Sequence, residues 1–86
     1  MSAAIPVRVT VLESWDEVSF APSPETAIHE LKRLALRATR TKGAPEDFLV
    51  KYLGAELSDE SASLVASGVV PHGALIVLRR RRAPTR

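Results

Sequence analysis

Alternating apolar and polar residues predict a pair of β-strands in the first part of the chain. Valine occupies every second position of residues 7–11, which is the period-two pattern of a strand with one buried face. After a polar turn over residues 13–16, the alternation resumes with Val18 and Phe20 and stops at Pro22. The short connection between the two runs predicts an antiparallel hairpin.

A one-sided helix is predicted to follow the hairpin. Ser23 or Thr26 can accept the free N–H groups of its first turn, and Pro24 suits that turn as well. Lys42, followed by Gly43, marks the end, so the helix would have roughly four turns. Its buried stripe is expected to contain Ala27, Ile28, Leu31, Leu34, Ala35 and Ala38, opposite a solvated stripe of Arg33, Arg37 and Arg40.

Three further strands are predicted in the second half of the chain. Residues 48–53 are strongly strand-like and stop at Gly54, residues 55–57 suit a short edge strand, and residues 74–78 form the last strand. The intervening residues 58–68 are expected to be irregular with one helical turn, and their anchors are Leu64, Val65 and Val69. Because only one long helix is present, it must cover one face of a mixed sheet of four to five strands, which is an α+β fold.

Charge is unevenly distributed along the 86 residues. Five of the twelve Lys and Arg residues lie within residues 79–86, which leaves seven basic and ten acidic side chains in residues 1–78. A chain of this length forms one domain only. We therefore expect a mildly acidic domain followed by a basic tail.

The absence of cysteine excludes a disulfide framework, a thiolate metal site and a cysteine nucleophile. The first residues lack the basic and apolar regions of a signal peptide, and the longest apolar run, residues 74–78, is too short to span a bilayer. A cytoplasmic protein is expected, and the Arg- and Ala-rich composition suits a bacterial source.

The order and spacing of the predicted elements resemble ubiquitin and its relatives from Val7 to Arg82. Pro24 precedes the helix as it does in ubiquitin. Residues 52–57 are similar to the family's strand, glycine turn and leucine, and residues 75–80 are similar to its last strand. The joint spacing over most of the chain carries the resemblance, because no single match is specific.

This resemblance implies a β-grasp (ubiquitin-like) domain over residues 1–82, with a short flexible tail over residues 83–86. A conjugated modifier ends in Gly-Gly, because its activating enzyme threads an unbranched terminus. Here Pro84 fixes φ within the tail, and the sequence contains no Gly-Gly pair. A non-conjugating member is therefore expected, similar to the small domains found in bacterial secretion systems and as accessory subunits of oxygenases.

Residues with catalytic potential are scattered through the sequence. His29 and His72 are far apart and lack companions at metal-ligand spacing. The four glycines suit turns and not a phosphate-binding loop, and no serine has the strand–turn–helix setting of a nucleophile elbow. We therefore expect neither enzymatic activity nor a cofactor or metal.

The alternation along the strands also predicts which side chains are free to bind a partner. Val9, Val11, Val50, Leu75 and Val77 are expected to face the helix, and Leu12, Leu49, Lys51, Ile76 and Leu78 to face away from it. Ubiquitin-like domains often bind partners through this outer face, and Lys51, Ile76 and Leu78 correspond to the isoleucine, histidine and valine of ubiquitin's patch. Lys51 interrupts the patch, so ubiquitin's own partners are not expected. The alternative is that these are scattered aliphatic residues of an ordinary surface.

The arginines that follow Leu78 allow two interpretations. The resemblance makes Arg80 and Arg82 counterparts of arginines that ubiquitin's terminal segment uses in recognition, and alternating arginines would also protect a sheet edge. The leading hypothesis is a non-catalytic adaptor or accessory subunit whose protein partner contacts Leu49, Lys51, Ile76, Leu78, Arg80 and Arg82. The alternative is an anion-binding module whose arginine tail binds nucleic acid or an anionic lipid membrane, with a steep dependence on salt.

Overall fold

Five strands and one long helix make up residues 4–80, the part of the chain that the computed structural model describes. In chain order the elements are β1 (Val7–Val11), β2 (Asp16–Phe20), α1 (Ile28–Ala38), the 3-10 helix η1 (Pro45–Asp47), β3 (Phe48–Tyr52), β4 (Ala55–Glu56) and β5 (Gly73–Arg79). This order confirms the predicted one. The predicted domain limit at residue 82 and the tail over residues 83–86 lie outside the described residues.

The strands form one mixed sheet in the order β2-β1-β5-β3-β4. Strands β1 and β5 are parallel, and every other neighbouring pair is antiparallel. Strand β5 therefore lies inside the sheet between β1 and β3, and the edges are β2 and β4. The expectation that the arginines at the end of β5 protect a sheet edge is wrong for the described residues, because β5 has a neighbour on each side.

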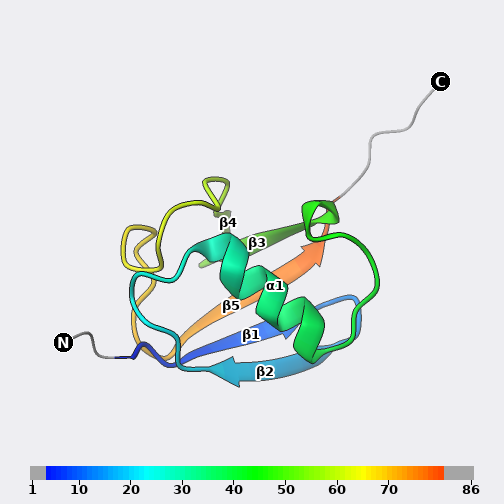
Figure 1. The fold of residues 1–86 in the computed structure, drawn as a ribbon, viewed down its shortest axis with the longest axis horizontal. Coiled ribbons are helices and arrows are strands. Elements are labelled where there is room, and N and C mark those ends of the chain that lie inside the picture. The colour runs from blue at the N-terminus through cyan, green and yellow to red at the C-terminus, as the bar shows by residue number, and fades with distance from the viewer. Residues whose placement is uncertain (1–3, 81–86) are drawn as a thin grey trace.

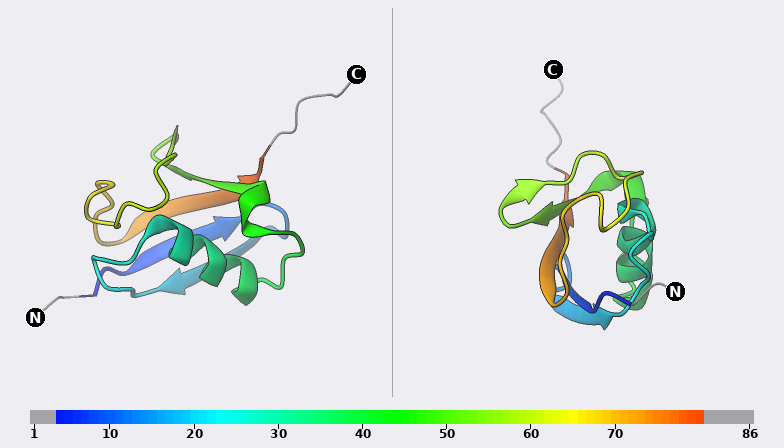
Figure 2. Two further views of the ribbon diagram at one scale, coloured as in Figure 1. Left: turned by 45° about the horizontal axis from the view of Figure 1, so that its top comes forward. Right: turned by 90° about the vertical axis from the view of Figure 1, so that its left-hand side faces the viewer.

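Helix α1 lies across one face of the sheet, and the sheet curves around it (Figures 1 and 2). The side chains between the two layers form a mainly aliphatic core that also contains Phe48 and Tyr52. Its most buried members, each at most 2% exposed, are Val7, Val9, Val11, Ile28, Leu31, Ala35, Phe48, Val50, Leu64, Leu75 and Val77. The five strand residues predicted to face the helix are all among them.

Helix α1 is shorter than predicted at its start, because another segment satisfies its first N–H groups. The N–H of Ile28 donates to the carbonyl oxygen of Ala62 at 3.0 Å, and that of His29 donates to the carbonyl oxygen of Glu60 at 2.8 Å. Ser23 and Thr26 instead share a hydrogen bond between their hydroxyls, at 3.4 Å. The predicted side-chain cap is therefore wrong, and a backbone segment distant in sequence replaces it.

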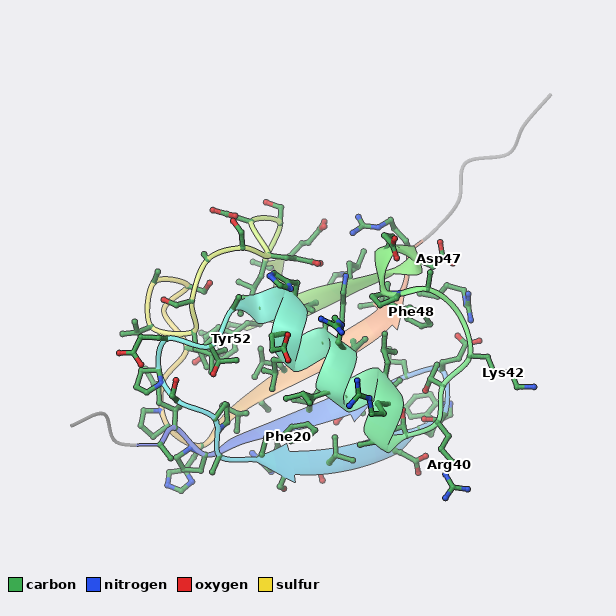
Figure 3. All side chains as sticks on the ribbon, viewed as in Figure 1. Phe20, Arg40, Lys42, Asp47, Phe48 and Tyr52 are labelled. Atoms are coloured by element: carbon green, nitrogen blue, oxygen red, sulfur yellow. The ribbon has the colours of Figure 1, made fainter. Side chains whose placement is uncertain are left out.

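The end of α1 also falls before the predicted Lys42 and Gly43. Arg40 has φ +55°, its N–H donates to Arg37 O at 3.1 Å, and the N–H of Thr41 donates to Leu36 O at 2.9 Å. This is the hydrogen-bond pattern of a Schellman motif, with an arginine at the position where glycine is usual. Arg40 and Lys42 point outward from the loop that follows the helix (Figure 3).

The buried stripe of α1 differs from the predicted one at several positions. Lys32 and Leu36 are buried, whereas Leu34 is only half-buried and Ala38 is exposed. The observed stripe follows the i, i+3, i+4, i+7, i+8 spacing from Ile28. Leu34 does not fall on this spacing, so it is only half-buried although its side chain is apolar. The buried residues of the helix are Ile28, Leu31, Lys32, Ala35 and Leu36.

The connection from β4 to β5 is irregular, as predicted, and packs onto the helix start. Leu64 is fully buried, and its N–H donates to Thr26 O at 2.9 Å. Val69 is buried as well, but Val65 is 60% exposed, so its predicted role as an anchor is wrong.

Candidate functional site

The outward side chains of three neighbouring strands meet on the face opposite α1. Leu49 of β3 is paired with Leu78 of β5, and Lys51 of β3 is paired with Ile76 of β5. Leu12 continues β1 by one residue, because its N–H donates to Val77 O at 2.9 Å. We call this surface the outer face, made up of Leu12, Leu49, Lys51, Ile76 and Leu78.

No helix within residues 4–80 covers the outer face (Figure 2). Ile76 is 38% exposed, and the other four members are half-buried. Directly opposite strand positions lie close enough for their side chains to touch, so the leucines form a continuous row from β1 to β3. The register thus brings together four of the six residues that the sequence predicted as a binding site.

Arg80, a fifth predicted site residue, makes its contacts on the helix side of the sheet edge. Its N–H donates to Asp47 O at 2.7 Å, and its guanidinium donates to Glu46 O at 3.2 Å and Phe48 O at 3.3 Å. It therefore ties the end of β5 to η1. The sixth predicted residue, Arg82, lies outside the described residues.

A polar hollow of about 570 Å³ opens beside Arg80. It is lined by His29, Lys32, Arg33, Pro45, Glu46, Glu60 and Arg80. At its floor the Lys32 ammonium, only 3% exposed, donates to Glu60 Oε1 at 2.7 Å and to Phe48 O at 2.9 Å. Within residues 4–80, Glu60 Oε2 is buried without a hydrogen bond, 4.0 Å from Arg80.

Sequence reasoning missed this buried ion pair. A lysine on a helix ordinarily faces solvent, and the segment that carries Glu60 contains no regular element to align with the helix. The sequence did contain one indication that Lys32 is buried. Lys32 lies four residues after Ile28, which places it within the helix stripe that faces the core.

Arg79 was also missed as a structural residue. It donates two hydrogen bonds to the carboxylate of Glu13, at 3.3 and 3.1 Å, and its guanidinium lies 4.7 Å from the centre of the Phe48 ring. The hydrogen bond to Glu13 raises the pKa of the Arg79 guanidinium above its ordinary value. The contacts join the β1–β2 turn to the end of β5.

Two turns present large apolar side chains to water. Trp15, between β1 and β2, is 80% exposed, and Leu53, between β3 and β4, is 85% exposed. Both have positive φ, a conformation that is unfavourable for such bulky residues. They lie at opposite ends of the sheet, because β1 and β3 run in opposite directions.

Metal sites and membrane-spanning helices are absent from residues 4–80. Within that range no group of three or more His, Asp or Glu side chains could hold a metal ion. No helix of the described chain is long and apolar enough to cross a membrane.

The sequence matches no protein-family model, and it matches no curated protein. Solved structures do match the fold. The ubiquitin-like domain of an Arabidopsis thaliana protein has a TM-score of 0.76 at 19% identity, over 96% of this chain and 86% of that one. Ubiquitin of Caldiarchaeum subterraneum has a TM-score of 0.76 at 12% identity, over 94% of this chain and 99% of that one.

A third similar structure is the C-terminal ubiquitin-like domain of mouse tubulin-specific chaperone e. Its TM-score is 0.77 at 13% identity, and the alignment covers 98% of this chain and 94% of that one. The identities are low, so these likenesses concern the fold alone. Together with the mixed sheet and its single covering helix, they show that this chain has the ubiquitin-like β-grasp fold.

Proposed function

We propose that the chain is a non-catalytic protein-interaction module, an adaptor or accessory subunit, that binds its partner through the outer face. The observation that carries this proposal is the row of three leucines on adjacent strands, with Ile76 beside it, on the face that α1 leaves open. An aliphatic cluster held on a rigid sheet loses little conformational entropy on binding and gains from the area that it removes from water. The similar ubiquitin-like domains support a protein as the partner.

The anion-binding alternative has less support among the described residues. Arg79 is held by Glu13 and Phe48. The Arg80 guanidinium is held by the carbonyl oxygens of Glu46 and Phe48 and by the carboxylate of Glu56. Arginines that are engaged in this way lose their own contacts when they turn to an external phosphate. Nucleic-acid or lipid binding would therefore depend on Arg81, Arg82 and Arg86, which lie outside the described residues.

Capture from a lysate of the native source at low and high salt separates the two proposals. The baits are the intact chain, the Ile76→Asp variant, and a variant in which Arg81, Arg82 and Arg86 are alanine. Arg79 and Arg80 stay in every bait, because both already make contacts with neighbouring elements of the fold. Val65→Asp is the matched control, since Val65 is an exposed valine whose N–H donates to Pro24 O, before the helix and away from the outer face.

We expect one protein to be retained at high salt by the intact chain, the triple alanine variant and Val65→Asp, and to be lost with Ile76→Asp. Retention that requires the arginines and disappears at high salt would instead favour the anion-binding module. Far-ultraviolet circular dichroism of each bait shows that it is folded.

A further inference from the structure

The outer face contains one charged side chain among aliphatic neighbours. Lys51 lies opposite Ile76 and two positions along β3 from Leu49, and it is half-buried. Among the described residues, none forms a hydrogen bond or an ion pair with its ammonium group. Any partner that covers this face must therefore cover an unpaired positive charge.

Glu56 would be the obvious counter-charge, because it is paired with Lys51 across β3 and β4. Directly opposite residues of an antiparallel pair project from the same face and lie within reach of each other. The Glu56 carboxylate is instead 3.5 Å from Arg80 Nη1. Arg80 is fixed in turn by its bonds to Glu46 O and Phe48 O, so it holds Glu56 at the sheet edge and away from Lys51.

Desolvation then decides what kind of partner fits. Covering an ammonium group with apolar atoms alone removes its hydration without compensation, whereas a carboxylate placed against it provides a charge-assisted hydrogen bond. Lys51 is a single cation beside Leu49 and Ile76, and Arg8, further along the same face of the sheet, lies 3.8 Å from the Glu17 carboxylate. This arrangement is unlike the arrays of cations that bind nucleic acid or anionic membranes. The chemistry of the face thus favours a protein segment.

We propose that the outer face recognises an aliphatic protein segment with one Asp or Glu carboxylate placed over Lys51. We propose further that Arg80 is a positioning residue, which keeps Lys51 available by holding Glu56. This inference rests on the proposed function and adds the chemical class of the partner.

Three synthetic helical peptides provide the probes, identical in their leucine and alanine face and differing only in a central Glu, Gln or Lys. Each is titrated into the isotopically labelled full chain, and its affinity is taken from the shifts of backbone amide signals. We expect the Glu peptide to bind about tenfold more tightly than the Gln peptide, and the Lys peptide to bind most weakly, with shifts on β3 and β5.

Substitutions in the chain identify the residues that are responsible for the preference for the Glu peptide. Lys51→Met should abolish the difference between the Glu and Gln peptides, whereas Lys42→Met, at an exposed lysine after the helix, should leave it unchanged. Arg80→Met should reduce the difference by releasing Glu56 to pair with Lys51. The double variant Arg80→Met/Glu56→Gln should restore it, which a merely structural role of Arg80 would not do.

Equal affinities for the three peptides, or a preference that survives Lys51→Met, would overturn the carboxylate proposal and leave the outer face as a binding surface. If no peptide shifts the outer-face signals, this inference is overturned, while capture by Ile76→Asp and Val65→Asp still decides the proposed function. A preference that survives Arg80→Met would remove the role assigned to Arg80 alone.

Discussion

Lys32 is the one charged side chain among the buried residues of the described chain. The desolvation cost is offset because its ammonium donates to the Glu60 carboxylate at 2.7 Å and to the carbonyl oxygen of Phe48 at 2.9 Å. These two bonds join α1 to both the start of β3 and the connection after β4. The lysine therefore links three parts of the chain that share no regular hydrogen-bonding pattern.

We expect Lys32→Ala to lower the free energy of unfolding by about 3 kcal/mol, because it leaves Glu60 and Phe48 O without their main partner. Arg33→Ala is the matched control, since Arg33 is the next residue on the helix and its side chain is half-exposed. Its expected effect is below about 0.5 kcal/mol. Urea unfolding measures both. Equal and small losses for the two variants would show that the Lys32–Glu60 pair contributes little.

At the scale of single elements, α1 shows how tertiary contacts override local signals. Ser23, Thr26 and Gly43 are suitable capping residues by type, yet the helix begins where Glu60 and Ala62 supply carbonyl oxygens and ends at a left-handed Arg40. The existence of the helix followed from its apolar periodicity. Its limits did not, because the groups that set its start lie more than thirty residues further along the chain.

The left-handed residue after α1 provides a prediction for this element. Arg40→Gly should raise the free energy of unfolding by about 1 kcal/mol, because glycine adopts φ +55° without the steric cost of a Cβ atom. Arg37→Gly, at an exposed position within the helix, should lower it by about 1 kcal/mol. The midpoint of urea unfolding reports both changes. Destabilisation by Arg40→Gly would contradict the assignment of the helix end.

At the scale of the whole molecule, the irregular connection between β4 and β5 completes the core. Leu64 is fully buried beneath it, whereas its neighbour Val65 is 60% exposed. We expect Leu64→Ala to cost about 3 kcal/mol of unfolding free energy through the cavity that it leaves. Val65→Ala should change it by less than about 0.5 kcal/mol. Thermal unfolding measures both changes. Similar losses of unfolding free energy for the two variants would contradict the burial of Leu64 and the exposure of Val65 in this connection.

Strand periodicity made most of the fold and part of the candidate site predictable. Alternation along β3 and β5 assigned Leu49, Ile76 and Leu78 to one face, because a side-chain period of two leaves no other choice once the core face is known. It could not place Arg80, whose position depends on backbone carbonyls of η1 and β3. It also could not show that Glu56 turns to Arg80, so that Lys51 has no ion-pair partner among the described residues, since that depends on the three-dimensional arrangement of three elements.

The isoleucines permit the most direct test of the central claim, because the sequence contains only Ile5, Ile28 and Ile76. Ile76 lies on the outer face, Ile28 is fully buried in the first turn of α1, and Ile5 is buried before β1. The measurement is the transfer of magnetisation from the captured partner to the labelled δ1-methyl groups of the full chain. We predict strong transfer to Ile76 and none to Ile5 or Ile28. A bound partner that leaves the Ile76 methyl unaffected would contradict the proposal that the outer face is the binding surface.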